Sequence, residues 1–399
     1  MGDFEFSEFQ SATLGHVHRN QPSQGTYAKI LSKSDFDTAY HEITSWQGYQ
    51  PTPLHQLDDI ANAISVDKIF YKDEAPRFGL ASFKALGGAY AAIRVLQKQI
   101  EKQTGQSVSM ADIRDGKYQT ECANITLVSA TDGNHGRSLS WGCQRYGAPC
   151  RIYIHAEVSE ERAEIMRGFG ADVIRITGDY DDSVRLAKEE AEANGWHVVS
   201  DTSWPGYSEP PRDVMAGYGV MVSEINYELD DAPTHVFVQG GVGGLAAGVA
   251  AALRHYWQDA SPRVVIVEPE YADCLYQSAK KGDAVTVNIE TESIMAGLSC
   301  GEPSQMAWDI IVEEATDYIT IPDNLVPPMM RMLACPAGTD APIQAGESAV
   351  AGLCAAVVAR HDKTLSAKLG LDASSRILII GSEGITDQHI YNQVMRGEL

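Results

Sequence analysis

The segment Ala81-Ser-Phe-Lys-Ala-Leu-Gly-Gly-Ala-Tyr90 carries the strongest signal in the chain, because it sets Lys84 at the start of an apolar helical pattern. Burying a free ammonium group is costly unless the group is paired. A Schiff base with an aldehyde removes the charge and makes the lysine a reactive group. Taken alone, the segment favours an ordinary surface lysine on an amphipathic helix, so the rest of the chain has to decide.

The overall composition is that of a globular protein. The chain has 399 residues, of which 44% are hydrophobic, which is enough for two or three domains or for two interleaved lobes. It contains no run of about 18 apolar residues, and its N-terminus lacks a signal-peptide pattern, so we expect a cytoplasmic protein without a membrane span. The formal net charge of −23 would repel phosphate backbones and argues against nucleic-acid binding.

The seven cysteines contain no Cys-x-x-Cys pair, which argues against a zinc site and a disulfide framework. We therefore expect no metal. Cys274 and Cys300 lie in loops late in the chain, and buried thiols are the simpler interpretation of both. The sequence does not tell whether they pair with each other.

Predicted strands and helices alternate along most of the chain, which is typical of parallel sheets covered by helices on both faces. The first 48 residues are polar, with one predicted helix over 34–45. The predicted strands cover residues 69–73, 125–130, 151–154, 172–176, 197–200, 235–238, 263–267 and 376–380. The predicted helices that follow them include 159–169, 181–194 and 245–254.

A glycine-rich loop, Gln239-Gly-Gly-Val-Gly-Gly-Leu-Ala-Ala-Gly248, follows the predicted strand 235–238 and leads into a helix. Glycines let the backbone approach an anion, and the helix start adds free N–H groups and the positive end of the helix dipole. A dinucleotide-binding turn competes with this phosphate loop, because Glu268 ends the next predicted strand. The candidate phosphate-binding residues are Gly240, Gly241, Val242, Gly243 and Gly244.

A second loop, Ser129-Ala-Thr-Asp-Gly-Asn-His-Gly136, also joins a predicted strand to a predicted helix. Such a loop either presents N–H groups to a ligand or forms a tight polar turn that caps the helix. Asp132 is unusual there, because a carboxylate is unfavourable in an anion-binding loop unless it transfers a proton or pairs with a cation. Ser382 follows the last predicted strand, where its hydroxyl is placed to reach a ring nitrogen or to cap a loop.

Together these segments resemble the fold-type II pyridoxal-phosphate enzymes, the group of threonine dehydratase and tryptophan synthase β. Ser82-Phe-Lys84 is similar to their lysine motif, and Gly133-Asn-His-Gly136 to their ring-binding asparagine loop. The likeness is greatest to the diaminopropionate ammonia-lyase family, over about residues 48–395 in the same order. Further segments that carry it are Tyr49–Leu54, Lys72–Glu74, Arg77–Leu80, Tyr180–Asp182, Val267–Pro269 and Cys300–Pro303.

Three positions depart from the family pattern. Ser82 stands where an alanine is expected, Ser382 where a threonine is expected, and Ile385 where a polar residue is expected. Ser382 keeps the hydroxyl. The departures at Ser82 and Ile385 bear on fine substrate preference, and none of the three bears on the cofactor.

The resemblance implies that pyridoxal phosphate is bound to Lys84 and that the reaction is an α,β-elimination. Its substrate would be D- or L-2,3-diaminopropionate, and its products pyruvate and two ammonia. Lys84 would act as the base for the L-isomer and Asp132 for the D-isomer. Asn134 would bind the ring 3-oxygen and Ser382 the ring nitrogen. The implied substrate-binding residues are Thr131, Asp132, Gly133, His135, Tyr180 and Asp201.

The resemblance also implies an α/β protein of two lobes, each a three-layer α/β/α arrangement with a mostly parallel sheet. The larger lobe would comprise residues 1–97 and 228–399, and the smaller lobe residues 98–227. A homodimer that binds a small amino acid is expected. The alternatives are a serine, threonine or hydroxyaspartate dehydratase, a non-catalytic pyridoxal-phosphate protein, and a nicotinamide-dependent dehydrogenase built on residues 240–248.

Overall fold

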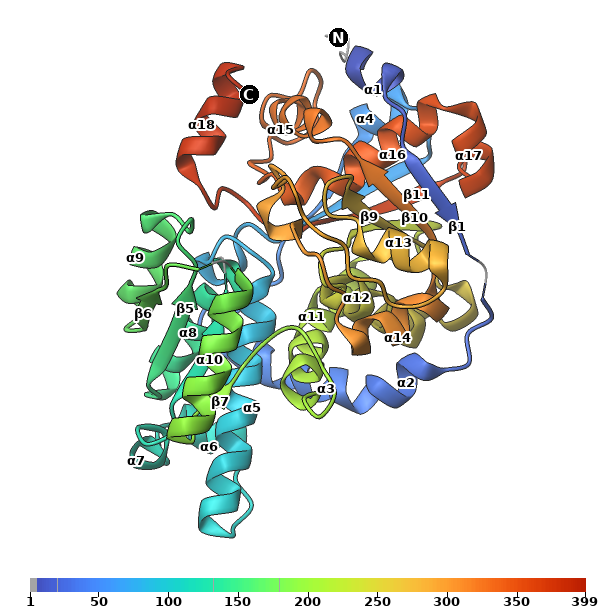
Figure 1. The fold of residues 1–399 in the computed structure, drawn as a ribbon. Coiled ribbons are helices and arrows are strands. Elements are labelled where there is room, and N and C mark those ends of the chain that lie inside the picture. The colour runs from blue at the N-terminus through green and yellow to red at the C-terminus, as the bar shows by residue number, and fades with distance from the viewer. Residues whose placement is uncertain (1–5, 20, 132, 179) are drawn as a thin grey trace. The chain divides into compact units, whose positions relative to one another are not determined.

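The computed structural model describes residues 6–19, 21–131, 133–178 and 180–399, with only the backbone described at 180 and 181. The chain divides into two compact units, each with its own β-sheet. Unit 1 comprises Met1–Lys33, Gln50–Ser82 and Met221–Leu399, and unit 2 comprises Ser34–Tyr49 and Phe83–Val220. Figure 1 labels the elements of both units.

Unit 1 is built on a seven-stranded sheet. Its strands are β1 (Gly15–His18), β2 (Leu54–Gln56), β3 (Lys68–Asp73), β8 (His235–Gln239), β9 (Arg263–Pro269), β10 (Ala315–Ile321) and β11 (Arg376–Gly381). Their order is β1-β10-β9-β8-β11-β3-β2. The five inner strands are parallel, and the edge strands β1 and β2 run antiparallel to their neighbours.

Helices cover this sheet. The α-helices of unit 1 are α1 (Ser7–Ser11), α2 (Thr26–Ile30), α4 (Asp58–Ala63), α12 (Gly244–Trp257), α13 (Cys274–Lys281), α14 (Gln305–Glu314), α15 (Val326–Ala334), α16 (Ala351–His361), α17 (Lys363–Leu369) and α18 (Gln388–Arg396). Phe237, Val265 and Ile379 share one hydrophobic cluster with α16. All five residues of β8 are buried, which requires cover on both faces because strand side chains alternate.

Unit 2 is built on a four-stranded parallel sheet with the order β6-β5-β4-β7. The strands are β4 (Leu127–Ala130), β5 (Cys150–Ile154), β6 (Asp172–Arg175) and β7 (His197–Val198). Its helices are α5 (Lys84–Thr104), α6 (Met110–Arg114), α7 (Gln119–Cys122), α8 (Asn134–Tyr146), α9 (Glu160–Gly168) and α10 (Tyr180–Asn194). Helices α3 (Lys33–Thr44) and α11 (Glu209–Glu228) cross the unit boundaries in sequence.

The unit boundaries differ from the predicted lobes, which assigned residues 83–97 to the larger lobe. The reason is that α5 is one continuous helix packed closely against α8. A Cβ atom on Gly142 would lie 2.8 Å from the Cα atom of Ala89, so the two helix backbones nearly touch. Residues 34–49 also join unit 2, where the ring of Phe36 lies against Gly219.

The predicted fold class is confirmed, and the predicted strands correspond to β3, β4, β5, β6, β7, β8, β9 and β11. The sequence missed β1, β10 and the three-residue edge strand β2. Strand β10 contains Asp317 with no exposed surface, and a charged residue there obscures the strand pattern. His16 on β1 lies 2.9 Å from the Asp317 carboxylate, and Arg263 on β9 donates to it at 2.6 Å. These tertiary ion pairs make the buried charge acceptable.

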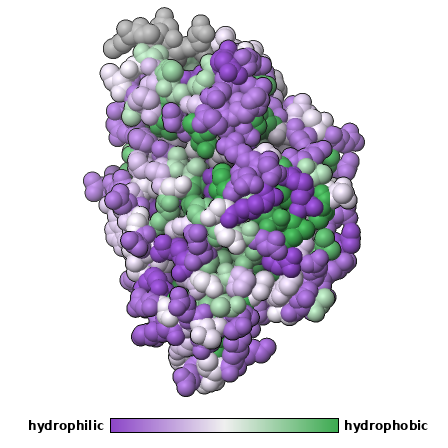
Figure 2. Space-filling model, turned by 90° about the vertical axis from the view of Figure 1, so that its left-hand side faces the viewer, coloured by the Kyte–Doolittle hydropathy of each residue, from purple (hydrophilic) through white to green (hydrophobic). Residues whose placement is uncertain are grey.

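The surface is consistent with the acidic composition. Figure 2 shows hydrophilic residues over most of the face in view, with small hydrophobic areas between them. Of the large hydrophobic side chains in the described residues, Tyr227, Tyr271 and Leu399 are exposed. Within the same residues, no helix is both long and apolar enough to cross a membrane.

Candidate active site

Lys84 begins α5 and makes an ion pair with Asp201 in unit 2. The Lys84 Nζ atom lies 2.5 Å from Asp201 Oδ2, and the two side chains are 21% and 17% exposed. The Lys84 ammonium therefore sits in a mostly enclosed place next to an anion. Burial acts to raise the pKa of Asp201, but the Lys84 charge and His135 outweigh it and hold that pKa below its ordinary value.

Two aromatic rings border the Lys84 ammonium. Nζ lies 5.4 Å from the ring centroid of Phe83 and 5.8 Å from that of Tyr218, within range of cation–π attraction. The two rings contact each other edge to face, with centroids 4.7 Å apart. The ring of Tyr218 also fills the place of a Cβ on Gly87, which explains part of the Gly87-Gly88 pair that follows the lysine.

The loop before α8 is shaped by Thr131. Its Oγ1 accepts hydrogen bonds from the N–H groups of Gly133 at 3.3 Å and Gly136 at 3.4 Å. Gly136 has no room for a side chain, because a Cβ there would lie 2.4 Å from Thr131 Cγ2. Asn134 is the first residue of α8. Asp132, the predicted base for the D-isomer, lies outside the described residues.

His135 joins this loop to the segment that carries Asp201. Its Nε2 donates to the backbone carbonyl of Val199 at 2.9 Å, two residues before Asp201. Burial lowers the pKa of His135, and the nearby Lys84 charge lowers it further. The ring is therefore neutral at pH 7 and acts as a structural donor. Among the described residues, its buried Nδ1 atom has no hydrogen-bond partner.

Unit 2 thus brings together Lys84, Asp201 and the loop from Thr131 to Gly136. Tyr180 is the first residue of α10, and only its backbone is described. Sequence reasoning assigned Asp201 to the substrate and did not link it to Lys84. The two residues are 117 positions apart in the sequence, so no local pattern indicates their pairing.

The glycine loop of unit 1 joins β8 to α12. Gly241 and Gly243 have φ values of 64° and 94°, which are unfavourable for residues with a side chain. Helix α12 begins at Gly244 without a side-chain cap. In the described residues, the N–H groups of Gly241 and Val242 have no hydrogen-bond partner. The loop therefore offers unsatisfied donors and a helix N-terminus, as an anion site requires.

Glu268 decides between the two interpretations of this loop. A dinucleotide site needs an acid at the end of the next strand that can reach ribose hydroxyls. Glu268 has no exposed surface, and its carboxyl group accepts hydrogen bonds from the N–H groups of Leu275 at 3.1 Å and Tyr276 at 2.8 Å. Its hydrogen-bonding capacity is used inside the protein, which removes the argument for a dehydrogenase.

The structure also gives the positions of Ser382 and of the cysteines that the sequence singled out. Ser382 follows β11 and is 3% exposed. All seven cysteines are free thiols, with Cys274 buried and Cys300 half-buried. The Cys274 Sγ atom lies 3.5 Å from the carbonyl oxygen of Gly241, so Cys274 belongs to the surroundings of the glycine loop. No cluster of three or more His, Cys, Asp or Glu side chains suited to a metal occurs within the described residues.

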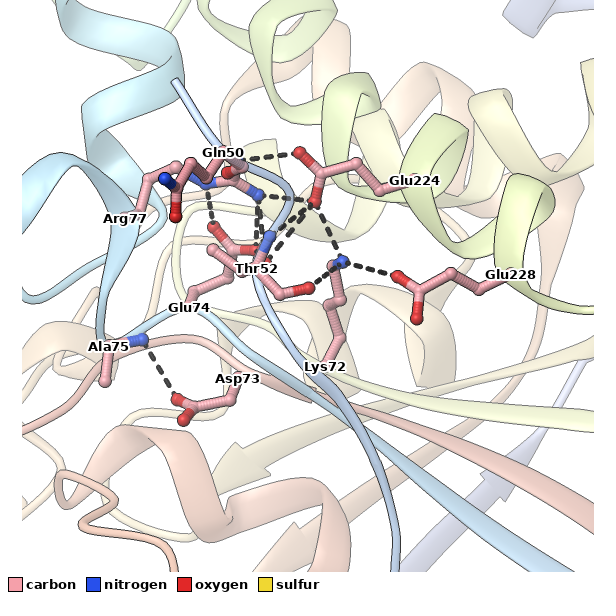
Figure 3. A network of polar contacts seen from close by, with 9 residues as sticks. All are labelled: Gln50, Thr52, Lys72, Asp73, Glu74, Ala75, Arg77, Glu224 and Glu228. Carbon is pink, nitrogen blue, oxygen red and sulfur yellow. Dashed lines mark hydrogen bonds and ion pairs between the residues drawn. The ribbon is translucent and has the colours of Figure 1, made fainter. Parts of the chain in front are cut away.

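A buried network of charges lies at the end of β3 (Figure 3). Arg77 donates to both oxygens of Glu74 at 2.8 Å and to the two oxygens of Glu224 at 2.7 and 2.8 Å. Lys72 Nζ donates to the backbone carbonyl of Thr52 at 2.7 Å and lies 2.8 Å from Glu224 Oε2. The network fixes the segment after β3, in which two non-glycine residues, Phe78 and Ala81, have positive φ values of 52° and 57°. Sequence reasoning gave this network no role.

A surface pocket of about 380 Å³ lies elsewhere in unit 2. Its walls come from α5, α10 and the segment before α11, and include Lys98, Lys188 and Trp204. Neither Lys84 nor Asp201 lines it. The reactive groups and this pocket are therefore separate features.

Residues 45–382 match the family of pyridoxal-phosphate dependent enzymes. The chain is 37% identical to the diaminopropionate ammonia-lyase of Escherichia coli K12, over 94% of this chain and 95% of that protein. It is 36% identical to the enzyme of Salmonella typhimurium, over 89% and 91% of the two chains. The structure of holo diaminopropionate ammonia lyase from Escherichia coli matches with a TM-score of 0.86 at 35% identity, covering 97% of this chain and 98% of that one.

The chain therefore belongs to the fold-type II pyridoxal-phosphate-dependent enzymes, and the diaminopropionate ammonia-lyases named above are similar to it at 35–37% identity over most of its length. The predicted family and the predicted cofactor are confirmed. The residues fit that cofactor, because Lys84 supplies an amine for its aldehyde and the glycine loop supplies a cradle for its phosphate. A Cβ on Gly240 would lie 2.4 Å from Glu268 Cγ, so a side chain there would force the loop to move.

Proposed function

We propose that the protein eliminates ammonia from D- and L-2,3-diaminopropionate. In the balanced reaction, one diaminopropionate and one water give one pyruvate and two ammonia. The Cα–H and Cβ–N bonds break, and water then replaces the remaining amino nitrogen. The observation that carries the proposal is the Lys84–Asp201 pair at the start of α5. It occurs in a chain that is similar over 94% of its length to the diaminopropionate ammonia-lyase of Escherichia coli.

Lys84 holds the cofactor and later transfers a proton. Pyridoxal phosphate, when bound, supplies an electron-withdrawing ring that stabilises the carbanion formed at Cα. Lys84 Nζ, once released by the substrate, is a neutral amine and takes the α-proton of the L-isomer. The Asp201 carboxylate orients Nζ, and because its pKa is held low it stays ionised rather than storing the proton. When the substrate is bound, the Asp201 carboxylate is an anionic partner for its cationic β-amino group.

Other residues bind the cofactor or position the substrate. Asn134, held at the start of α8, donates to the ring 3-oxygen. Of the predicted phosphate-binding residues Gly240, Gly241, Val242, Gly243 and Gly244, Gly241, Val242 and Gly244 would bind the phosphate through backbone N–H groups. The N–H of Gly240 donates to the Val267 carbonyl at 2.9 Å and that of Gly243 to the Gly240 carbonyl at 3.3 Å, so these two glycines shape the loop. Ser382 meets the ring nitrogen with a neutral hydroxyl, which favours loss of the β-group over transamination. Thr131, Gly133 and His135 shape the substrate loop.

Product stoichiometry tests the proposal. The purified protein is incubated with D- and L-diaminopropionate, and pyruvate and ammonia are measured. We expect two ammonia for each pyruvate. A serine dehydratase would release one ammonia per pyruvate, and a threonine dehydratase would form 2-oxobutyrate, so kcat/KM for each amino acid separates the alternatives. A protein without yellow colour, and without a borohydride adduct on Lys84, would refute the account.

Isomer selectivity tests the assignment of two bases. Asp132→Asn removes the carboxylate from the loop, so we expect kcat on the D-isomer to fall at least about 100-fold while the L-isomer loses less than about 10-fold. Initial rates on each isomer measure this. Asp172→Asn, which removes a mostly exposed carboxylate, is the matched control and leaves both rates unchanged. Equal losses on both isomers would contradict the two-base assignment.

The assembly and the location of the protein stay predictions. We expect a homodimer, by analogy with the family named above, and a cytoplasmic protein. Light scattering of the purified protein at micromolar concentration measures the assembly. A monomeric mass at full activity would show that one chain suffices for the reaction.

A further inference from the structure

Glu268 lies directly beneath the glycine loop. It is the sixth residue of β9 and has no exposed surface. A Cβ atom on Gly240 would meet three of its side-chain atoms, Cγ at 2.4 Å, Cδ at 3.0 Å and Oε1 at 3.1 Å. The glutamate side chain therefore occupies the space that a residue larger than glycine would need at the start of the loop.

The carboxyl group of Glu268 caps the first turn of α13. Oε1 accepts from the N–H of Leu275 at 3.1 Å, and Oε2 accepts from the N–H of Tyr276 at 2.8 Å. Asp273, at the N-cap position of this helix, makes no side-chain cap hydrogen bond. Glu268 thus supplies, from a neighbouring strand, the cap that the helix does not provide for itself.

Cys274, the first residue of α13, contacts both the glycine loop and Glu268. Its Sγ lies 3.5 Å from the carbonyl oxygen of Gly241 and 3.8 Å from Glu268 Oε1, so its single S–H donates to one or the other. On the opposite side of the loop, the N–H of Ser304 donates to the carbonyl of Val242 at 2.8 Å. The carbonyl groups of Gly241 and Val242 thus both have a donor nearby, whereas among the described residues the N–H groups of Gly241 and Val242 have no partner and are available to a ligand.

We propose that Glu268 is a positioning residue that fixes the glycine loop against the first turn of α13, and that its charge is coupled to the binding of an anion in the loop. This inference rests on the proposed role of Gly240 to Gly244 in phosphate binding. Glu268 itself does not touch the phosphate. It acts through the backbone of Gly240.

Because Glu268 can change its charge, the proposal predicts a measurable pH dependence of anion binding. Burial raises the pKa of its carboxyl group to about 8, and the hydrogen bonds of the α13 N–H groups offset only part of this rise. The titratable groups that face it are Asp273 and Cys274 on α13, Tyr318 on β10, and Cys300 beyond Cys274. None of these four groups is a cation, so none of them compensates an ionised Glu268.

The expected pH dependence follows from linkage. With a pKa of about 8, the carboxyl group is mostly neutral at pH 7 and mostly an anion at pH 9, beneath an anion-binding loop. A bound phosphate group stabilises the neutral form, so its affinity must fall as the pH rises through the pKa. For one group with a pKa near 8, the dissociation constant rises at most about 10-fold between pH 7 and pH 9.

The probe for this effect is 4′-deoxypyridoxine 5′-phosphate, which has no aldehyde and so does not react with Lys84. The full chain, freed of cofactor, is titrated with it by fluorescence from pH 6.5 to 9.5. We expect the dissociation constant of the wild type to rise about 5- to 10-fold from pH 7 to pH 9. Glu268→Gln should bind with a constant that changes less than about 2-fold. Glu270→Gln, an exposed glutamate two residues later, is the matched control and should follow the wild type.

A second variant covers a failure of Glu268→Gln to fold. The hydrogen bond from Cys274 lowers the pKa of Glu268, so Cys274→Ala should move the midpoint of the pH dependence upwards. A flat wild-type profile, a Glu268→Gln profile that matches the wild type, or an unmoved midpoint in Cys274→Ala would each overturn the proposal. If the wild type binds pyridoxal phosphate and releases pyruvate but gives one of these results, only the role of Glu268 fails. If it does neither, the proposed function fails first.

Discussion

Two lysines that are 12 positions apart in the sequence, one fully buried and one partly exposed, differ in how fully their charges are satisfied. Lys72, on β3, has no exposed surface, and its Nζ lies 2.7 Å from the Thr52 carbonyl oxygen, 2.8 Å from a Glu224 carboxylate oxygen and 3.6 Å from one of Glu228 (Figure 3). Lys84 is 21% exposed and is paired with the Asp201 carboxylate beside two aromatic rings.

The difference shows that burial alone does not identify a reactive lysine. The Lys72 ammonium is enclosed by a carbonyl group and carboxylates, which hold it inside unit 1. The Lys84 ammonium lies beside two aromatic rings and one carboxylate in a partly open place, where an aldehyde can reach it. Lys72 therefore serves the structure of unit 1, whereas Lys84 is suited to chemistry.

The largest expected effect is on catalysis at Lys84. Lys84→Ala removes the amine that binds the cofactor and takes the α-proton, so we expect pyruvate release from both isomers to fall at least about 1,000-fold. The far-ultraviolet circular dichroism should keep the wild-type shape. Lys98→Ala, on the same helix, removes a lysine whose ion pair is with a mostly exposed glutamate and serves as control. A Lys84→Ala protein with more than a tenth of the wild-type rate would contradict the assignment of Lys84 as the reactive lysine.

The next effect is on stability at Lys72. Lys72→Met leaves the Glu224 carboxylate with one buried partner fewer, and we expect the free energy of unfolding to fall by about 3–5 kcal/mol. Urea denaturation followed by fluorescence measures it. Lys68→Met, at the exposed start of the same strand, should change stability by less than about 0.5 kcal/mol. Equal effects at both positions would mean that the buried network contributes nothing special.

The smallest effect concerns the pH dependence of the Asp201 pair. A carboxyl group with a lowered pKa stabilises the folded state above its unfolded pKa of about 3.8, and this contribution is lost as the pH falls below that value. We therefore expect the difference in Tm between the wild type and Asp201→Asn to stay constant from pH 5 to 8 and to shrink below pH 4.

Asp213 provides a control of opposite sign for this measurement. Burial raises its pKa, and the Arg94 charge offsets only part of the rise. A raised pKa means that the wild type loses stability relative to Asp213→Asn as the pH rises through the range of the two pKa values. Differential scanning calorimetry of both variants from pH 3.5 to 8 measures the two trends. Parallel trends would contradict the different charge states assigned to the two carboxyl groups.

Most of the fold could be predicted from local sequence patterns. Apolar runs of strand length, glycine loops and helix starts depend on neighbours within a few residues, and eight strands and the fold class were confirmed. Strand β2 has only three residues, too few for a strand pattern. Strands β1 and β10 were not predicted because Asp317 lies inside β10 and is acceptable only with His16 and Arg263 in place. The boundary between the two units differs from the predicted boundary between the lobes for a similar reason. The close contact of α5 with α8 depends on residues of both helices, so the sequence of α5 alone does not predict it.

The sequence by itself determined which residues are chemically able to act: a lysine before a glycine pair, a loop of glycines after a buried strand, and a family pattern over nearly the whole chain. Only the tertiary structure decided how their charges are satisfied. It paired Lys84 with Asp201 over a separation of 117 positions, paired Lys72 with Glu224 inside a buried network, and placed Glu268 beneath the glycine loop. The physical reason is that the charge state of a buried group depends on its neighbours in space, and residues far apart in sequence supply those neighbours.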